Sequence, residues 1–268
     1  MENNQIMQLT ENYLTEKVDK KKTEYLKELL QHISSRKLSE KQYIELFEKV
    51  NDANGVRLAI LTRAPRNALI EIYKKISLDN TKTDKYWYDQ NYILMKLGEL
   101  RQYEADNILT DASKCNLNTV ILKKAIKAAS LETLLEFIKT DYLLKELEGE
   151  IVSKLKTFKS VEIANSFWDT GKDFVRICMA KYVSKDRLIS LLCTKNSRRN
   201  VYLDSEAKEN LRSYELTEEE AKMIMDKVTD EKIRLFASEY VSKEYILQNI
   251  SKETDIQIVE SFLKKLNN

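Results

Sequence analysis

The sequence predicts an all-α fold, and three observations lead to it. Among 268 residues there are only 4 Gly and 1 Pro, so the residues that form tight β-hairpin turns and phosphate-binding loops are scarce. Charged residues make up 33% and hydrophobic residues 43% of the chain, which is typical of an ordered protein that buries a core. Segments with an apolar face at helical spacing recur along the chain.

Apolar runs in the chain are short. The longest, such as Leu188–Cys193, fall far below the roughly 18 residues that a membrane span needs, and the N-terminus lacks a basic stretch followed by an apolar one. Three cysteines without CxxC spacing, Cys115, Cys178 and Cys193, favour a reducing compartment. We therefore expect an unprocessed cytoplasmic protein that does not bind a membrane.

Internal repeats indicate how the helices are arranged. Four segments align without a gap: Val56–Tyr73, Ile121–Ile138, Val175–Leu192 and Ile233–Ile250. Weaker copies begin at Leu30, Tyr92, Ile151 and Lys208. The chain then contains eight copies, whose first residues are 24 to 36 residues apart.

The tenth position of the copies predicts helix starts. It holds Ser39, Pro65, Arg101, Ser130, Ser160, Ser184, Thr217 and Ser242. Ser and Thr hydroxyls accept hydrogen bonds from the free amides of a following helix, and the missing N–H of Pro65 is not needed there. Thr217 with Glu220, and Ser39 with Gln42, have capping-box spacing. Each copy is therefore expected to be a short helix, a turn and a second helix.

The eighteenth position predicts the core. It holds Phe47, Tyr73, Leu109, Ile138, Trp168, Leu192, Met225 and Ile250. Amphipathic helices of any protein share a period of 3.6 residues and align loosely. That period alone does not produce a capping hydroxyl and a large apolar residue at two constant offsets. The joint pattern favours stacked helical hairpins.

Three copies carry an Asp ahead of a Val-Arg or Ile-Arg pair: Asp52-x-x-x-Val56-Arg57, Asp173-x-Val175-Arg176 and Asp230-x-x-Ile233-Arg234. With their Leu-containing second helices, these copies resemble degenerate HEAT or armadillo-like repeats over about residues 30–250. The resemblance implies a right-handed α-solenoid of about eight short helix-turn-helix repeats. It also implies that Arg57, Arg176 and Arg234 tie neighbouring repeats together.

We expect a single domain over residues 1–268. Helices with a polar outer side cover the apolar ends of such a stack, and we predict these caps at residues 1–29 and 254–268, with the repeats at 30–250. Both ends can be covered in this way, and the oligomeric state stays open.

Charge is unevenly distributed, although the net charge is only +2. Residues 114–199 hold 17 basic and 10 acidic side chains, whereas residues 204–260 hold 8 basic and 15 acidic ones. Distant segments stay apart in a repeat array, so each region is able to attract an oppositely charged partner.

The basic region is a candidate binding surface for an acidic protein or a nucleic acid. The alternative is a solvated lysine-rich surface without a partner. The candidate binding residues of the basic region are Lys123, Lys124, Lys127, Lys154, Lys156, Lys159, Arg187, Lys195, Arg198 and Arg199.

An aromatic cluster, Tyr86, Trp87, Tyr88 and Tyr92, is a second candidate binding surface. Tyr and Trp are frequent at binding hot spots and stack on nucleic-acid bases. Aromatic residues that alternate with polar ones on a helix more often lie half in the core, which is the alternative for this cluster.

Common catalytic signatures are missing: GxxxxGK[ST], GxGxxG, HExxH, GxSxG and an EF-hand loop. With His32 as the single histidine, we expect no catalytic residue, metal or cofactor. HEAT-like DNA glycosylases resemble the chain in size and helical repeats, and they use a carboxylate near tryptophans. Trp87 with Asp89 and Trp168 with Asp169 are the candidate pairs, but the spacing within each pair points its side chains to different helix faces.

The sequence favours a non-catalytic protein that binds another macromolecule, first of all a protein, by shape and charge. Its richness in Lys, Asn and Ile indicates an AT-rich bacterial or phage genome, in which such proteins serve as adaptors, immunity proteins or inhibitors of defence systems. Nucleic-acid binding through the basic region, with or without base excision, is the alternative.

Overall fold

The computed structural model describes residues 2–35, 38–50, 54–78, 83–114, 117–140, 143–194 and 200–267. In these residues the chain forms 18 α-helices and two short 3-10 helices, and it contains no strand. The prediction of an all-α fold is confirmed. None of the helices in this part of the chain has both the length and the apolarity that crossing a membrane requires.

The helices group into two compact units, Met1–Leu147 and Glu148–Asn268. The first unit contains α1 (Glu2–Thr15), α2 (Asp19–Ser35), α3 (Glu40–Lys49), α4 (Asn54–Arg63), α5 (Arg66–Leu78), α6 (Thr83–Leu97), α7 (Gln102–Asp111), α8 (Thr119–Ala128), α9 (Leu131–Lys139) and η2 (Lys145–Leu147). The second unit contains α10 (Glu148–Leu155), α11 (Val161–Trp168), α12 (Asp173–Met179), α13 (Lys185–Cys193), α14 (Val201–Leu211), α15 (Glu218–Lys227), α16 (Glu231–Ser238), α17 (Lys243–Asn249), η3 (Ile250–Lys252) and α18 (Ile256–Asn267).

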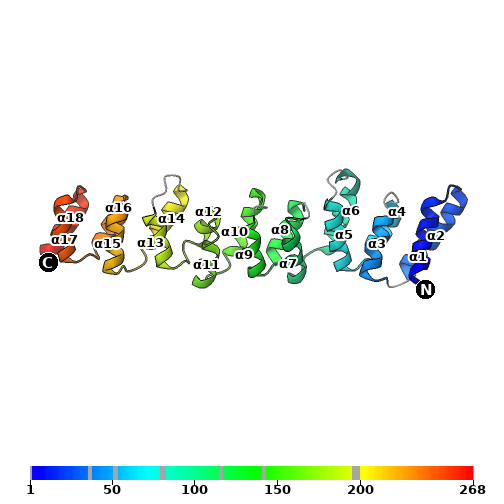
Figure 1. Ribbon diagram of the computed structural model, residues 1–268, viewed down its shortest axis with the longest axis horizontal. Helices are drawn as coiled ribbons and strands as arrows, with labels where there is room; N and C mark the ends of the chain where they lie inside the picture. Colours follow the sequence, from blue (N-terminus) through cyan, green and yellow to red (C-terminus); the bar gives the residue numbers. More distant parts are fainter. Residues whose placement is uncertain are drawn as a thin grey trace. The chain divides into compact units, whose positions relative to one another are not determined.

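Within each unit the helices form two layers. In the first unit, consecutive helices lie side by side as pairs, from α1 with α2 to α7 with α8 (Figure 1). Most helices that are two apart in the chain also pack on each other, so odd-numbered helices form one layer and even-numbered helices the other. The second unit has the same two kinds of contact, from α11 with α12 to α17 with α18.

All eight residues of the tenth position directly precede an odd-numbered helix, from α3 to α17. An amide hydrogen bond from the first helical turn is accepted by the hydroxyls of Ser39, Ser130, Thr217 and Ser242. Both predicted capping boxes are present. The predicted hydroxyl cap is wrong for Ser160 and Ser184. The Ser184 hydroxyl donates to Asn165 Oδ1, and its oxygen accepts from Arg187 Nη1 and not from a backbone N–H.

The helix pairs that pack most closely are not the pairs within the predicted copies, but pairs shifted along the chain by one helix. A capped turn joins an even-numbered helix to the following odd-numbered one, as Ser130 does between α8 and α9. The extensive contacts are instead between an odd-numbered helix and the even-numbered helix after it. A cap sets where a helix begins, whereas burial of apolar faces decides which helices pack.

The eighteenth position lies in the core, as predicted, in seven of the eight copies. The exception is Ile250, which is half-buried and begins η3 after α17.

Two further contacts recur at equivalent positions. Asp106 and Asn165 each occupy the fifteenth position of a copy, on α7 and α11. Their side-chain oxygens accept the backbone N–H of Ser130 at 2.7 Å and of Ser184 at 3.0 Å, and also accept the hydroxyls of these serines. Each contact thereby links one odd-numbered helix to the next.

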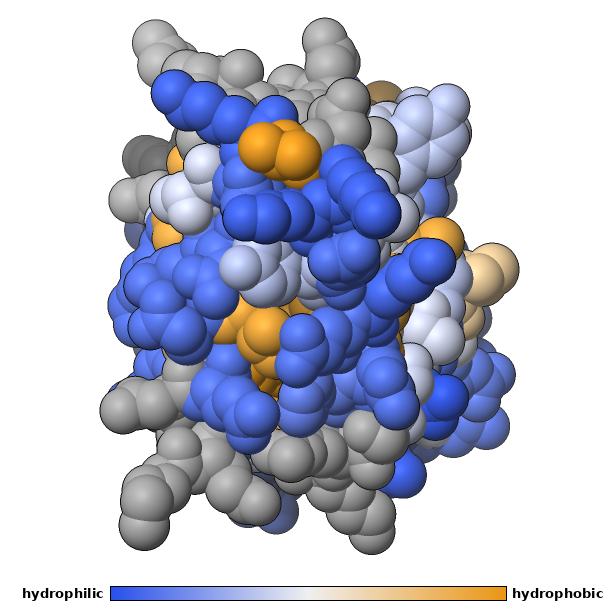
Figure 2. All heavy atoms as spheres, turned by 90° about the vertical axis from the view of Figure 1, so that its right-hand side faces the viewer, coloured by the Kyte–Doolittle hydropathy of each residue, from blue (hydrophilic) through white to orange (hydrophobic). Residues whose placement is uncertain are grey.

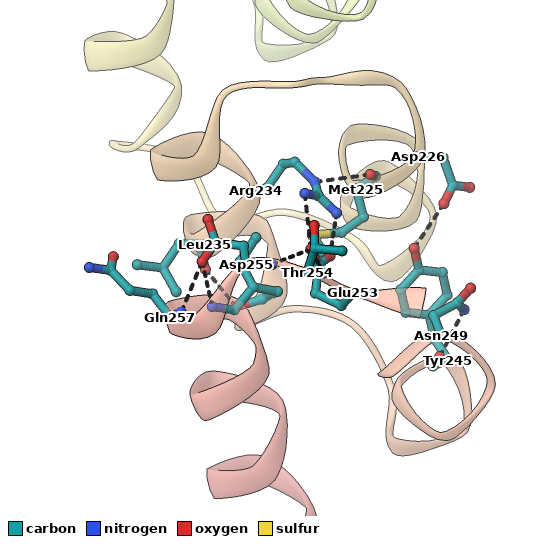
Figure 3. Close-up of polar contacts among 12 residues, drawn as sticks. Met225, Asp226, Arg234, Leu235, Tyr245, Asn249, Glu253, Thr254, Asp255 and Gln257 are labelled. Carbon is teal, nitrogen blue, oxygen red and sulfur yellow. Dashed lines mark hydrogen bonds and ion pairs between the residues drawn. The ribbon is translucent and has the colours of Figure 1, made fainter. Parts of the chain in front are cut away.

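Arg176 and Arg234 hold the second position of their copies and make the same contact. The Nε atom of each donates to the backbone carbonyl of the preceding eighteenth residue, Trp168 at 3.1 Å and Met225 at 3.3 Å. Arg234 also binds the carboxylate of Glu253, in the segment that leads into α18 (Figure 3). Arg176 and Arg234 therefore each tie their helix to the one before it, whereas Arg57, at the second position of its copy, pairs with Asp89 of α6 instead.

Candidate functional site

Burial divides the predicted aromatic cluster on α6 into two pairs. Tyr86 is buried, and Tyr92 is half-buried with its hydroxyl 2.9 Å from Thr62 Oγ1 on α4. Trp87 and Tyr88 are 57% and 77% exposed. Their rings meet edge to face, with centroids 4.9 Å apart. Two of the four aromatic side chains are therefore available for binding.

A buried ion pair anchors α6 to α4. Arg57 Nε lies 2.9 Å from Asp89 Oδ2, and both side chains are less than one-tenth exposed. The guanidinium also lies over the Tyr86 ring, 5.5 Å from its centroid. Burial raises the pKa of Asp89 above its ordinary value, and the charge of Arg57 offsets part of the rise. Because neither charge is stable alone in the core, the pair holds α6 in the rotation that turns Trp87 and Tyr88 outwards.

Two lysines contact the C-terminal ends of α4 and α6. Lys96 Nζ on α6 donates to the carbonyl of Leu61 at 2.7 Å, near the end of α4. Lys124 Nζ on α8 donates to the carbonyl of Gly98 at 2.7 Å. Gly98 follows α6 with a φ of +56°, the left-handed conformation that often ends a helix. A cation at a helix C-terminus is favoured by the helix dipole, so these lysines fasten α4, α6 and α8 in succession.

The exposed sides of α4, α6 and α8 carry large apolar side chains. Met95 is 72% exposed and lies seven residues after Tyr88, on the same side of α6. Leu58 stands one turn before Thr62 on α4, as Tyr88 stands one turn before Tyr92 on α6, and the Thr62 and Tyr92 hydroxyls are in contact. We name as the α6 face the exposed residues Leu58, Trp87, Tyr88, Met95 and Val120.

The helices of the α6 face expose no carboxylate among their described side chains. Neither α4 nor α8 contains Asp or Glu. In α6, Asp89 is buried, and the side chain of Asp84 lies outside the described residues. The turn after α6 carries one exposed carboxylate, Glu99. Aromatic residues and Met without Asp or Glu are typical of the centre of a binding surface.

Three of the predicted basic residues, Lys123, Lys124 and Lys127, lie on α8 next to Val120. Lys124 is engaged with the end of α6, whereas Lys123 makes no hydrogen bond or ion pair with any described residue. Arg63, exposed at the end of α4, makes none with them either. Burial and the charge of Arg63 lower the pKa of Lys96. Positive charge therefore accompanies the α6 face on both α4 and α8.

The other predicted basic residues are not part of the α6 face as it is defined above. Lys154 lies on α10, and Lys156 and Lys159 are exposed in the segment after it, in the second unit. Arg187 makes a two-point contact with Asp169, at 3.1 Å from Nε to Oδ1 and 2.8 Å from Nη2 to Oδ2. Outside the described residues lie Lys195, Arg198 and Arg199.

The carboxylates considered for base excision are both held by arginines. Asp89 is paired with Arg57 in the core. Asp169 binds Arg187, which lowers the pKa of Asp169, and Trp168 beside it is buried. Within the described part of the chain, no three or more His, Cys, Asp or Glu side chains are placed to hold a metal ion.

Leu58, Met95 and Val120 were missed by sequence reasoning. Met95 could have been found, because it follows Tyr88 at helical spacing. Leu58 and Val120 stand in apolar segments, VRLAIL and VIL, in which neighbouring residues are buried. Only the packed structure separates their exposed positions from the core.

The chain was compared with models of protein families, with curated proteins and with solved structures, and none of them matches it.

Proposed function

We propose that this protein is a non-catalytic scaffold that binds another protein through the α6 face. The observation that carries the proposal is the exposure of Trp87, Tyr88 and Met95 on a helix whose opposite side is anchored by a buried ion pair. Large aromatic side chains on a rigid support lose little conformational entropy on binding and are the residues that dominate protein interfaces.

We further propose a right-handed α-solenoid of about eight HEAT-like repeats. In support, each unit supplies four copies of an even-numbered helix, a turn and an odd-numbered helix. The contact shared by Arg176 and Arg234, and the one shared by Asp106 and Asn165, support the same repeat. Of the remaining helices, α1 and α18 would belong to the caps. The side of the first unit that α1 and α2 form is mostly hydrophilic (Figure 2), as a cap requires.

The proposed role is that of an adaptor, an immunity protein or a phage-encoded inhibitor acting in the cytoplasm of a bacterium. Such roles need a specific protein surface and no catalytic centre. The support is the richness of the chain in Lys, Asn and Ile, together with the α6 face.

Affinity capture from the native host tests the binding function. Tagged wild type, Tyr88→Ala and Tyr202→Ala are compared, with bound proteins quantified by mass spectrometry. Tyr202 is a matched control because it is equally exposed, on α14. A protein retained by wild type and by Tyr202→Ala but lost from Tyr88→Ala supports the proposal. Equal retention by all three chains, or no retained protein, contradicts it.

Nucleic-acid binding is a second candidate, favoured by one observation. Lys123, Lys156 and Lys159 make no hydrogen bond or ion pair with the described residues, so their charges are available to phosphates. Titration with single- and double-stranded DNA and RNA across salt concentrations tests it. Affinity that falls with salt and with reversal of these lysines to Glu supports it, and no binding at low salt rules it out.

A further inference from the structure

The α6 face combines an apolar centre with positive charge on the adjoining helices. Its apolar side chains come from three successive even-numbered helices, held together by Arg57, Lys96 and Lys124. Arg63 and Lys123 stand on α4 and α8, on either side of α6 in the chain. A ligand with the complementary pattern has apolar side chains between carboxylates.

We propose that the α6 face binds an acidic amphipathic segment of its partner protein. Apolar side chains of that segment pack on Trp87, Tyr88 and Met95, and its carboxylates lie near Arg63 and Lys123. The inference rests on the proposed protein-binding function and adds the chemistry of the partner.

Charge complementarity is the first argument for this occupant. A basic segment would meet Arg63 and Lys123, and the described side chains of α4, α6 and α8 offer no exposed carboxylate to neutralise it. Like charges brought together at an interface disfavour the wrong partner. Among the described side chains of these helices, an acidic segment meets no exposed carboxylate, and it meets two cations that make no hydrogen bond or ion pair with described residues.

The proportion of apolar to cationic side chains favours a protein segment over a nucleic acid. Five large apolar residues are exposed on the α6 face, whereas Lys96 and Lys124 already bind backbone carbonyls. Phosphate backbones are bound by several cations, each of which adds to the salt dependence. An amphipathic helix or strand instead uses a few apolar anchors.

Selection from a random peptide library tests the partner chemistry without knowledge of the natural partner. Displayed 20-residue peptides are selected on the immobilised full chain at physiological salt. The enriched peptides are then synthesised and titrated against wild type, Tyr88→Ala and Tyr202→Ala. Because Trp87 is exposed and Trp168 is buried, protection of the exposed tryptophan from acrylamide quenching reports binding at the α6 face.

The expected peptides combine Asp or Glu with large apolar residues. They bind wild type and Tyr202→Ala equally, lose roughly 30-fold or more in affinity for Tyr88→Ala, and protect Trp87. Circular dichroism of each variant verifies that it folds.

Three results would overturn the inference. The first is the absence of a peptide whose binding depends on Tyr88, or enrichment of basic or uncharged peptides. The second is Tyr88-dependent binding of a dT20 oligonucleotide in place of peptides. The third is Tyr88-dependent self-association in sedimentation, which would make a second copy the occupant. If Tyr88 is needed for capture from the host but the selected peptides are not acidic, the binding function stands and only the partner chemistry fails.

Discussion

Helices α6 and α14 expose similar side chains in opposite electrostatic settings. Both belong to the even-numbered layer of their own unit. On α6 the exposed residues include Trp87 and Tyr88, and on α14 they are Val201 and Tyr202, at 79% and 76% exposure. Beside Tyr202, α14 presents the exposed carboxylates of Glu206 and Glu209 on the same side. The helices of the α6 face present none in their described residues.

The two helices also differ in how they are anchored. The ion pair between Arg57 and Asp89 that holds α6 to α4 is buried. On α14, Lys208 Nζ reaches Asp204 of the same helix and lies 2.8 Å from Asp230 Oδ2 at the start of α16, with all three side chains partly exposed. An exposed aromatic residue alone does not mark a binding site. The buried ion pair, and the lack of exposed carboxylates among the described side chains of α4, α6 and α8, distinguish α6 from α14.

The largest expected effect concerns the anchors. We expect Arg57→Ala to lower the free energy of unfolding by about 3–5 kcal/mol, because it leaves the Asp89 charge buried without its partner. Lys208→Ala should cost about 1 kcal/mol or less, since its ion pairs are partly solvated. Denaturant unfolding measures the change in the free energy of unfolding of each variant, and amide hydrogen exchange in α6 and α14 shows which helix is destabilised.

A double replacement is the control for this prediction. Arg57→Met with Asp89→Leu removes both charges together and should recover most of the lost stability. Equal costs for Arg57→Ala and Lys208→Ala would show that α6 and α14 are anchored alike, contrary to our comparison.

A smaller effect is expected from charges at the surface. For a captured partner, Lys123→Glu should weaken binding about tenfold and lower the association rate, because it places a carboxylate on the face that meets the acidic segment. Glu206→Lys, the opposite reversal on α14, should leave the affinity unchanged. Surface plasmon resonance at two salt concentrations measures both, and tighter binding by Lys123→Glu would refute the charge argument.

The smallest expected effect is on the pH dependence of stability. The contributions of Asp89, which anchors α6, and Asp230, which binds Lys208 of α14, should change with pH in opposite directions. The pKa of Asp89 is raised by burial, so the native state holds this proton to higher pH than the unfolded state does. Its contribution to stability therefore falls as pH rises from the ordinary aspartate value of about 3.9 through the raised value.

Asp230 behaves in the opposite way. Burial raises its pKa, but hydrogen bonds from Lys208 and from the backbone N–H of Ile233 outweigh burial and lower it overall. Its contribution is present above about 3.9 and is lost as pH falls through the lowered value. Asp89→Asn and Asp230→Asn should thus alter stability-versus-pH curves in opposite directions. Curves altered in the same direction would contradict this assignment.

The helix starts could be predicted from the sequence because caps act over a few residues. A hydroxyl such as that of Ser39 or Thr217 needs only the next turn of chain to make its hydrogen bond. The division of the aromatic cluster could not be predicted in the same way. Tyr86 and Tyr88 are two residues apart on one helix, and only Tyr86 lies on the side of α6 from which Asp89 pairs with Arg57 of α4.

The lysines show the same limit. Lys123 and Lys124 are neighbours in sequence and both were predicted to bind a partner. Lys124 is engaged by the carbonyl of Gly98 because α8 lies at the end of α6. Contacts between helices, which depend on packing and not on local spacing, separate a structural lysine from one that is open to a ligand.

Site-specific photo-crosslinking in the native host tests most directly whether binding is concentrated on the α6 face. A photoreactive phenylalanine replaces Tyr88 in one chain and Tyr202 in another, both at highly exposed positions. We predict a crosslinked protein adduct from position 88 and none from position 202. An adduct only from position 202, or only nucleic acid attached at position 88, would contradict the account.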